Sequence, residues 1–97
     1  MTGNYFSPNA GDSIIVRLKI DRQGQTLAKI TTKITELSGI LGAIDIVRPI
    51  SKEGSIRDFS IYTNGPEHAD KIVDTLRAIQ GVELIQHSDR TFLLHHG

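Results

Sequence analysis

The chain has 97 residues, enough for one domain with a single core but short for a typical two-domain enzyme. Its 11 basic and 11 acidic residues give a formal net charge of zero, so charge alone offers no long-range attraction to nucleic acid or to an anionic membrane. The lack of cysteine excludes disulfides, thiol catalysis and thiolate metal sites, and it fits the reducing cytoplasm, where we expect the protein to reside.

The first segment, residues 1–12, is small, polar and turn-forming, and we expect it to be a flexible leader. It lacks the basic and then apolar order of a secretory signal. No apolar run in the chain approaches the roughly 20 residues of a membrane span, so we expect no membrane partner. Residues 13–20 (SIIVRLKI) then place apolar side chains at the even positions, with Arg17 and Lys19 on the opposite face. This alternation predicts a half-buried strand.

A helix is predicted next, because the apolar residues 27, 30, 34 and 37 recur at helical spacing. Gly24 precedes the helix and Gly39 follows it, and we expect left-handed backbone geometry at these two glycines. The turn from Asp21 would leave the first N–H groups of the helix pointing beyond the preceding strand, where a carboxylate or phosphate could bind. Most such helix ends bind only water, so this pattern alone does not decide for a ligand.

Two strands joined by a hairpin are expected after that helix. Residues 42–50 (GAIDIVRPI) are rich in β-branched side chains, and residues 51–55 (SKEGS) resemble a hairpin turn in which Gly54 takes a positive φ. Residues 56–63 form the returning strand, with Phe59 and Ile61 on one face.

The second predicted helix starts at Asn64 or Gly65 as the cap, with Pro66 in its first turn, and it ends at Gly81. Its apolar stripe is residues 69, 72, 73, 76 and 79, and a strand follows over residues 82–87. The order β, α, β, β, α, β predicts an α+β ferredoxin-like sandwich, a four-stranded antiparallel sheet in the order 4-1-3-2 with both helices on one face. The open face mixes charged and apolar residues, which suggests partial burial by a partner.

Several functional classes are disfavoured by the residues themselves. The first strand lacks the aromatic residues with which an RNA-recognition module stacks bases. The candidate metal ligands His68, His87, His95 and His96 do not have a metal-binding spacing. No serine lies in a nucleophile motif and no carboxylate pair stands out, so we expect no catalytic residues, no cofactor and no enzymatic activity in this chain.

Residues 13–88 resemble an ACT domain, a small regulatory module that binds amino acids or related metabolites. The most specific part is the run D-x-x-G-x-x-L-x-x-I from Asp21 to Ile30, although Gln23 replaces the usual proline and residues 39–42 (GILG) lack the usual asparagine. Residues 42–48 and 88–95 are similar to the N-terminal ACT domain of bacterial NAD-dependent malic enzymes, also called malate oxidoreductases. This resemblance implies that residues 89–97 lead into a catalytic domain, and that the parent chain is a decarboxylating malate dehydrogenase that this module regulates.

Two hypotheses follow for the function. In the first, an amino acid or another carboxylate metabolite acts as an allosteric effector, the N–H groups of residues 23–26 bind its carboxylate, and Asp21 faces an ammonium group if one is present. In the second, the module has lost its ligand and serves as a homodimerisation or docking element. The residues expected around the ligand are Asp21, Gln23, Gly24, Gln25, Thr26, Leu27, Gly42, Ala43, Ile44 and Asp45.

Overall fold

A computed structural model of the chain describes residues 13–89, so the expected leader and nearly all of the expected tail lie outside the described part. The elements are β1 (Ser13–Ile20), α1 (Gly24–Glu36), β2 (Ile40–Ser51), β3 (Gly54–Tyr62), α2 (Pro66–Arg77) and β4 (Val82–Asp89). Neither helix is long and apolar enough to cross a membrane. The element order is the predicted one.

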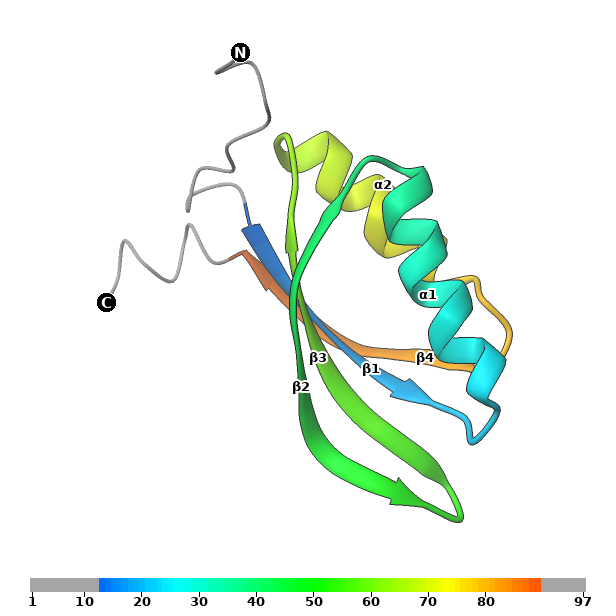
Figure 1. Cartoon of the computed structure of the whole chain (residues 1–97). Coiled ribbons are helices and arrows are strands. Elements are labelled where there is room, and N and C mark those ends of the chain that lie inside the picture. Colours follow the sequence, from blue (N-terminus) through cyan, green and yellow to red (C-terminus); the bar gives the residue numbers. More distant parts are fainter. Residues whose placement is uncertain (1–12, 90–97) are drawn as a thin grey trace.

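The four strands form one antiparallel sheet in the order β2-β3-β1-β4, and both helices cover the same face of it (Figure 1). This is the predicted ferredoxin-like sandwich, with β1 and β3 in the centre and β2 and β4 at the edges. The start of β1 pairs with the end of β4, since Ile14 lies opposite Asp89. The prediction of fold class and strand order is therefore confirmed.

The core lies between the sheet and the helices and comes from the alternating residues of β1 and the apolar stripes of both helices. Its buried apolar members are Ile14, Val16, Leu18, Ile20, Ile30, Ile34, Phe59, Ile61, Ile72, Val73 and Leu76. Leu27 and Leu37, at the two ends of the predicted α1 stripe, are partly buried and pack against this core. The predicted apolar faces of β1, β3 and both helices are thus confirmed.

The ends of α1 differ from the prediction. Gly24 is the first residue of the helix and does not have a positive φ, because the chain enters α1 through Gln23 in an extended conformation. At the other end Ser38 takes the left-handed conformation (φ 66°) that was expected of Gly39. Gly39 lies in a crowded place, since a Cβ there would lie 3.0 Å from Cδ1 of Ile72.

The β2–β3 hairpin is longer than predicted and extends beyond the helices (Figure 1). β2 begins at Ile40, two residues before the predicted start, and β3 begins at Gly54. Gly54 has the predicted positive φ (101°), and a Cβ there would run into the backbone carbonyl oxygen of Ile20. The hairpin turn therefore packs directly against the end of β1.

The second helix begins as predicted and ends earlier. Gly65 is the N-cap and Pro66 occupies the first helical turn, where its missing N–H has no cost. The helix ends at Arg77, and a short turn leads to Gly81, which was expected to end the helix itself. This turn brings Gly81 next to Asp21, whose N–H donates a hydrogen bond to the Gly81 carbonyl oxygen (2.9 Å).

Candidate ligand site at the first turn

The Asp21 side chain holds the turn between β1 and α1 together. Its Oδ1 accepts hydrogen bonds from the Gln23 N–H (3.1 Å) and from the Thr26 hydroxyl (2.7 Å). The first contact is the Asx-turn that aspartate commonly forms two residues ahead of itself. Thr26 is buried, so its hydroxyl has Asp21 in place of water as its partner. Asp21 is therefore a structural residue of the turn.

The N–H groups expected to bind a carboxylate are only partly available. Gln23 donates to Asp21 and the Thr26 N–H donates to the Gln23 carbonyl oxygen (3.1 Å). Within residues 13–89, no protein acceptor is found for the N–H groups of Gly24 and Gln25, as expected at the start of a helix. Two of the four predicted donors thus remain for a ligand.

A cavity of about 100 Å³, called the turn cavity below, lies between this turn and the β2–β3 hairpin. Its lining residues are Ile20, Asp21, Arg22, Gln23, Gly24, Leu27, Ile50, Ser55 and Arg57. Four of the predicted site residues are among them, namely 21, 23, 24 and 27, whereas Gln25 and Thr26 are not. The lining thus combines apolar residues with two arginines.

The second predicted segment, residues 42–45, does not reach the turn cavity within one chain. Ile20, the last residue of β1, lies opposite Ser55, whereas Asp45 lies opposite Asp58, further along β3. The expectation that the Asp21–Leu27 turn meets residues 42–45 is therefore wrong for a single chain. The hairpin instead brings Ile50 and Ser55 to the turn, because their part of it packs against the end of β1.

Arg57 is the main residue of this region that the sequence reasoning missed. It lies opposite Leu18, on the same side of the sheet as Phe59 and Ile61, where the helices pack. Its Nε is 3.4 Å from the Ser55 hydroxyl. The signal was present in the sequence, because positions 57, 59 and 61 share one face and an arginine on an otherwise apolar face is unusual.

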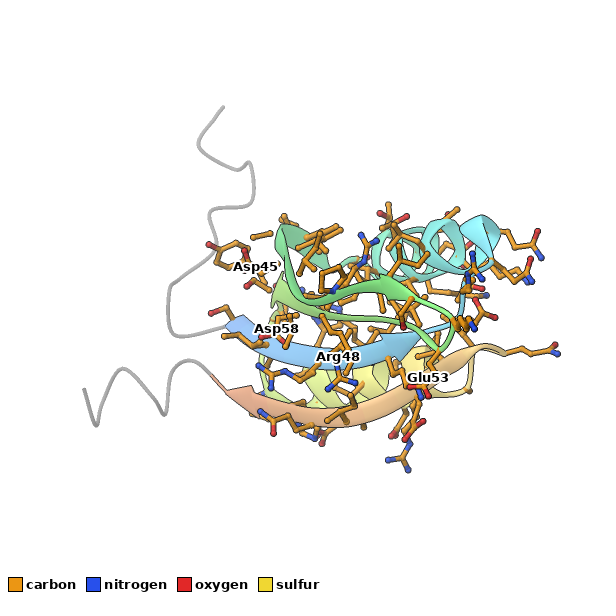
Figure 2. The ribbon with its side chains drawn as sticks, turned by 90° about the horizontal axis from the view of Figure 1, so that it is seen from below. Asp45, Arg48, Glu53 and Asp58 are labelled. Carbon is orange, nitrogen blue, oxygen red and sulfur yellow. The ribbon has the colours of Figure 1, made fainter. Side chains whose placement is uncertain are left out.

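The open face of the sheet carries a paired arginine instead. Arg17 Nε and Nη2 donate to the two carboxylate oxygens of Asp58, at 2.8 and 3.0 Å. This hydrogen-bonded carboxylate raises the pKa of Arg17 above its usual range. Asp45 lies opposite Asp58 in the neighbouring strand, and Figure 2 shows both on the strands of this face with Arg48 nearby. This bidentate ion pair holds the Asp58 side chain in place on the open face.

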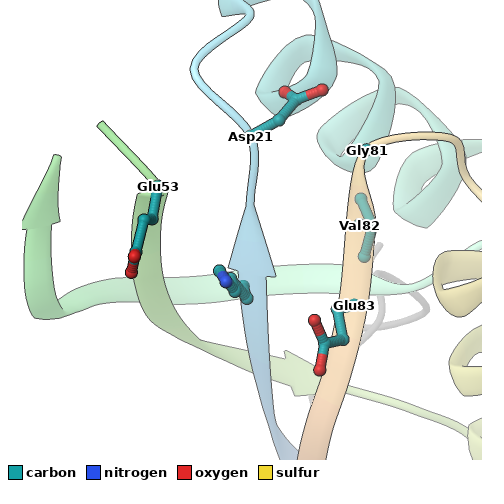
Figure 3. A pocket seen from close by; sticks show the side chains of 6 residues that line it. Asp21, Glu53, Gly81, Val82 and Glu83 are labelled. Carbon is teal, nitrogen blue, oxygen red and sulfur yellow. The ribbon is translucent and has the colours of Figure 1, made fainter. Parts of the chain in front are cut away.

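A larger hollow of about 280 Å³ lies beside the same turn at the end of the open face. It is lined by Lys19, Asp21, Glu53, Gly81, Val82 and Glu83. Figure 3 shows the Asp21 carboxylate directed away from the Glu53 and Glu83 carboxylates, towards the helix. Three carboxylates and one lysine give this hollow a net negative charge, which disfavours the binding of an anion.

The histidines do not form a metal site in the described residues, among which no cluster of three metal-ligating side chains occurs. His68 connects the two helices: its Nδ1 accepts from the Asn64 N–H (2.9 Å), and its Nε2 lies 2.6 Å from the Leu37 carbonyl oxygen. Since Nδ1 is the acceptor, Nε2 carries the proton. His95 and His96 lie outside the described residues.

Comparison with known proteins agrees with this fold. No family model matches the sequence. The NAD-dependent malic enzyme of Geobacillus stearothermophilus is 31% identical over 88 residues, which are 91% of this chain and 18% of the relative. The crystal structure of the ACT domain from GTP pyrophosphokinase of Chlorobium tepidum has a TM-score of 0.58 at 19% identity, covering 75% of this chain and 96% of that one. The chain therefore has the ACT-domain fold and resembles, in sequence, a segment of an NAD-dependent malic enzyme.

Proposed function

We propose that this chain is a regulatory, non-catalytic module that binds a small carboxylate metabolite in the turn cavity. The observation that carries the proposal is the position of Arg57, which lines a cavity beside the start of α1. Guanidinium groups and helix N-termini both favour carboxylates, and here they border the same space. The apolar side chains of Leu27 and Ile50 provide contact for the carbon chain of the metabolite.

The module would act as an allosteric domain of a longer enzyme. The chain spans about a fifth of the malic enzyme that it resembles, so a parent with NAD-dependent malate-decarboxylating activity is part of this proposal. A ligand that binds one arrangement of such an enzyme more tightly than another shifts the population towards that arrangement. The turn is suited to this role, because it contacts both the hairpin through the cavity and the α2–β4 turn through Gly81.

The proposal is tested by a thermal-shift screen of the purified chain against amino acids, monocarboxylates and dicarboxylates. A ligand present at 100 times its dissociation constant stabilises the fold by about 2.7 kcal/mol. The Arg57→Gln variant should lose most of this stabilisation, whereas Arg77→Gln, on the exposed side of α2, should retain it. Absence of any shift across the panel would refute ligand binding.

A second candidate function, homodimerisation, is favoured by the edge strand β2. Ile46 and Ile50 on this strand are 61% and 60% exposed, and Val47 between them is 44% exposed. A long edge strand with apolar side chains is a ready template for pairing with another chain. The predicted residues 42–45 lie on this strand, so their contribution to a ligand site would require a second copy paired against it.

Sedimentation equilibrium tests this second candidate at micromolar concentration. A dimer should form, and Ile46→Lys should dissociate it because a charge would be buried in the interface. Lys52→Glu, at the exposed tip of the hairpin, is a control that changes charge outside the pairing region. A single 10.7 kDa species for the parent chain at high concentration would refute dimerisation.

A further inference from the structure

We infer that the ligand of the turn cavity is a dicarboxylic acid that lacks an amino group, with one carboxylate on Arg57 and the other on Arg22. This inference rests on the proposed function and adds the class of ligand and the residues that select it. It departs from an amino-acid ligand, which the resemblance to ACT domains implies.

Arg57 has no ion-pair partner among the described residues. Its one side-chain partner among these residues is the Ser55 hydroxyl at 3.4 Å. Arg17 on β1 differs in this respect, because both carboxylate oxygens of Asp58 accept hydrogen bonds from its guanidinium. An unpaired, half-buried guanidinium beside a cavity has several donors available in the planar geometry that a carboxylate matches.

Arg22 is the second cationic residue that lines the turn cavity. Arg22 lies in the turn itself, is exposed, and also has no carboxylate partner among residues 13–87. Arg22 and Arg57 belong to segments that approach each other only through the fold, one in the turn and one on β3. The inferred ligand would therefore place one carboxylate at each of these two arginines.

The turn cavity has no free carboxylate for an ammonium group. Among the described residues, Asp21 is the only carboxylate that lines it. Its Oδ1 is already used by Gln23 and Thr26, and its other oxygen, Oδ2, lies against Gly81 so closely that a Cβ there would overlap it. Asp21 therefore cannot turn towards a ligand without leaving the buried Thr26 hydroxyl unpaired, which costs about 1–3 kcal/mol.

The rest of the lining is partly apolar. It includes Ile20, Leu27 and Ile50. Methylene groups suit such a lining, whereas an ammonium group would lose hydration there without gaining a free carboxylate as its partner. A volume of about 100 Å³ fits a short chain of a few carbons.

The experiment compares three probes with the same four-carbon backbone by isothermal titration of the purified chain. Succinate carries two carboxylates, butanoate carries one, and aspartate is succinate with an added amino group. We expect succinate to bind roughly tenfold or more tightly than butanoate, since one guanidinium–carboxylate pair is lost, and roughly tenfold or more tightly than aspartate.

Two variants and one control assign the ends of the ligand. Arg22→Gln should reduce succinate binding to the level of butanoate while leaving butanoate unchanged, and Arg57→Gln should weaken both. Arg77→Gln, whose guanidinium is 3.9 Å from Asp74 on α2, should bind all probes as the parent does. Without ligand, the variants and the parent chain should have the same midpoint of urea unfolding. Equal midpoints would show that a substitution changed ligand binding and not the stability of the fold.

The outcomes separate this inference from the proposed function. If aspartate binds as tightly as succinate, the dicarboxylate inference is wrong but the proposed ligand-binding role stands. The same holds if an unrelated amino acid is the only compound of the thermal-shift screen that binds. Unchanged succinate binding by both Arg22→Gln and Arg57→Gln would also overturn the inference, because the site would then lie elsewhere. Absence of binding by every compound in the screen would overturn both.

Discussion

The packing of the hairpin turn against β1 makes Gly54→Ala strongly destabilising. Gly54 has φ 101°, and a side chain in such a conformation costs on the order of 1–3 kcal/mol. The new Cβ would also overlap the Ile20 carbonyl oxygen, a backbone atom that moves only if the end of β1 moves. Overpacking of this kind typically costs about 1–3 kcal/mol more, so the expected loss is about 2–6 kcal/mol of unfolding free energy.

The matched control is Gly24→Ala, a glycine with neither constraint. It is the first residue of α1, its φ is not positive, and a Cβ there meets nothing within 4 Å. Alanine should therefore stabilise the chain by about 0.4–1 kcal/mol, because it restricts the unfolded chain more than glycine does. Urea unfolding followed by circular dichroism measures both changes. A loss below about 0.5 kcal/mol for Gly54→Ala, the range of ordinary surface substitutions, would refute the described contact between hairpin and β1.

Two further substitutions test the core and the turn. Ile34→Ala should lower the unfolding free energy by about 2–5 kcal/mol because Ile34 is fully buried in the core. Thr32→Ala, at an exposed position of the same helix, should change it little. An equal effect of the two substitutions would mean that the buried face of α1 is misassigned. Asp21→Ala should lower the unfolding free energy by about 1–3 kcal/mol because the buried Thr26 hydroxyl loses its hydrogen-bond partner. The same substitution in a Thr26→Val background should lower it less. An equal loss in both backgrounds would show that this hydrogen bond is not the cause.

The fold was predictable because its main determinants are periodic and local. Alternation in β1 and the helical stripes at residues 27–37 and 69–79 identified the buried faces, and the order of elements left few topologies. The ends of the helices were less predictable. Ser38 takes the left-handed conformation that was expected of Gly39, and the space at Gly39 is limited by Ile72, a contact that depends on how the helices pack.

The candidate site was predictable only where it is contiguous in the sequence. The turn from Asp21 to Leu27 is a local pattern, and the structure places a cavity beside it. Ile50, Ser55 and Arg57 reach that cavity through the register that sets Ile20 opposite Ser55, which no local pattern specifies. The role of Asp21 was also out of reach, because its bond to Thr26 depends on the exact path of the turn.

The central position of β1 has a consequence for folding during synthesis. β1 is made first, yet both of its neighbours in the sheet, β3 and β4, are made later. Pairing between β1 and β4 joins segments about 70 residues apart, and contacts of such long sequence separation slow folding. The nascent chain therefore exposes one hydrogen-bonding edge of its central strand until residues 82–89 have left the ribosome, and a product ending before Val82 would present β1 as an open, aggregation-prone edge.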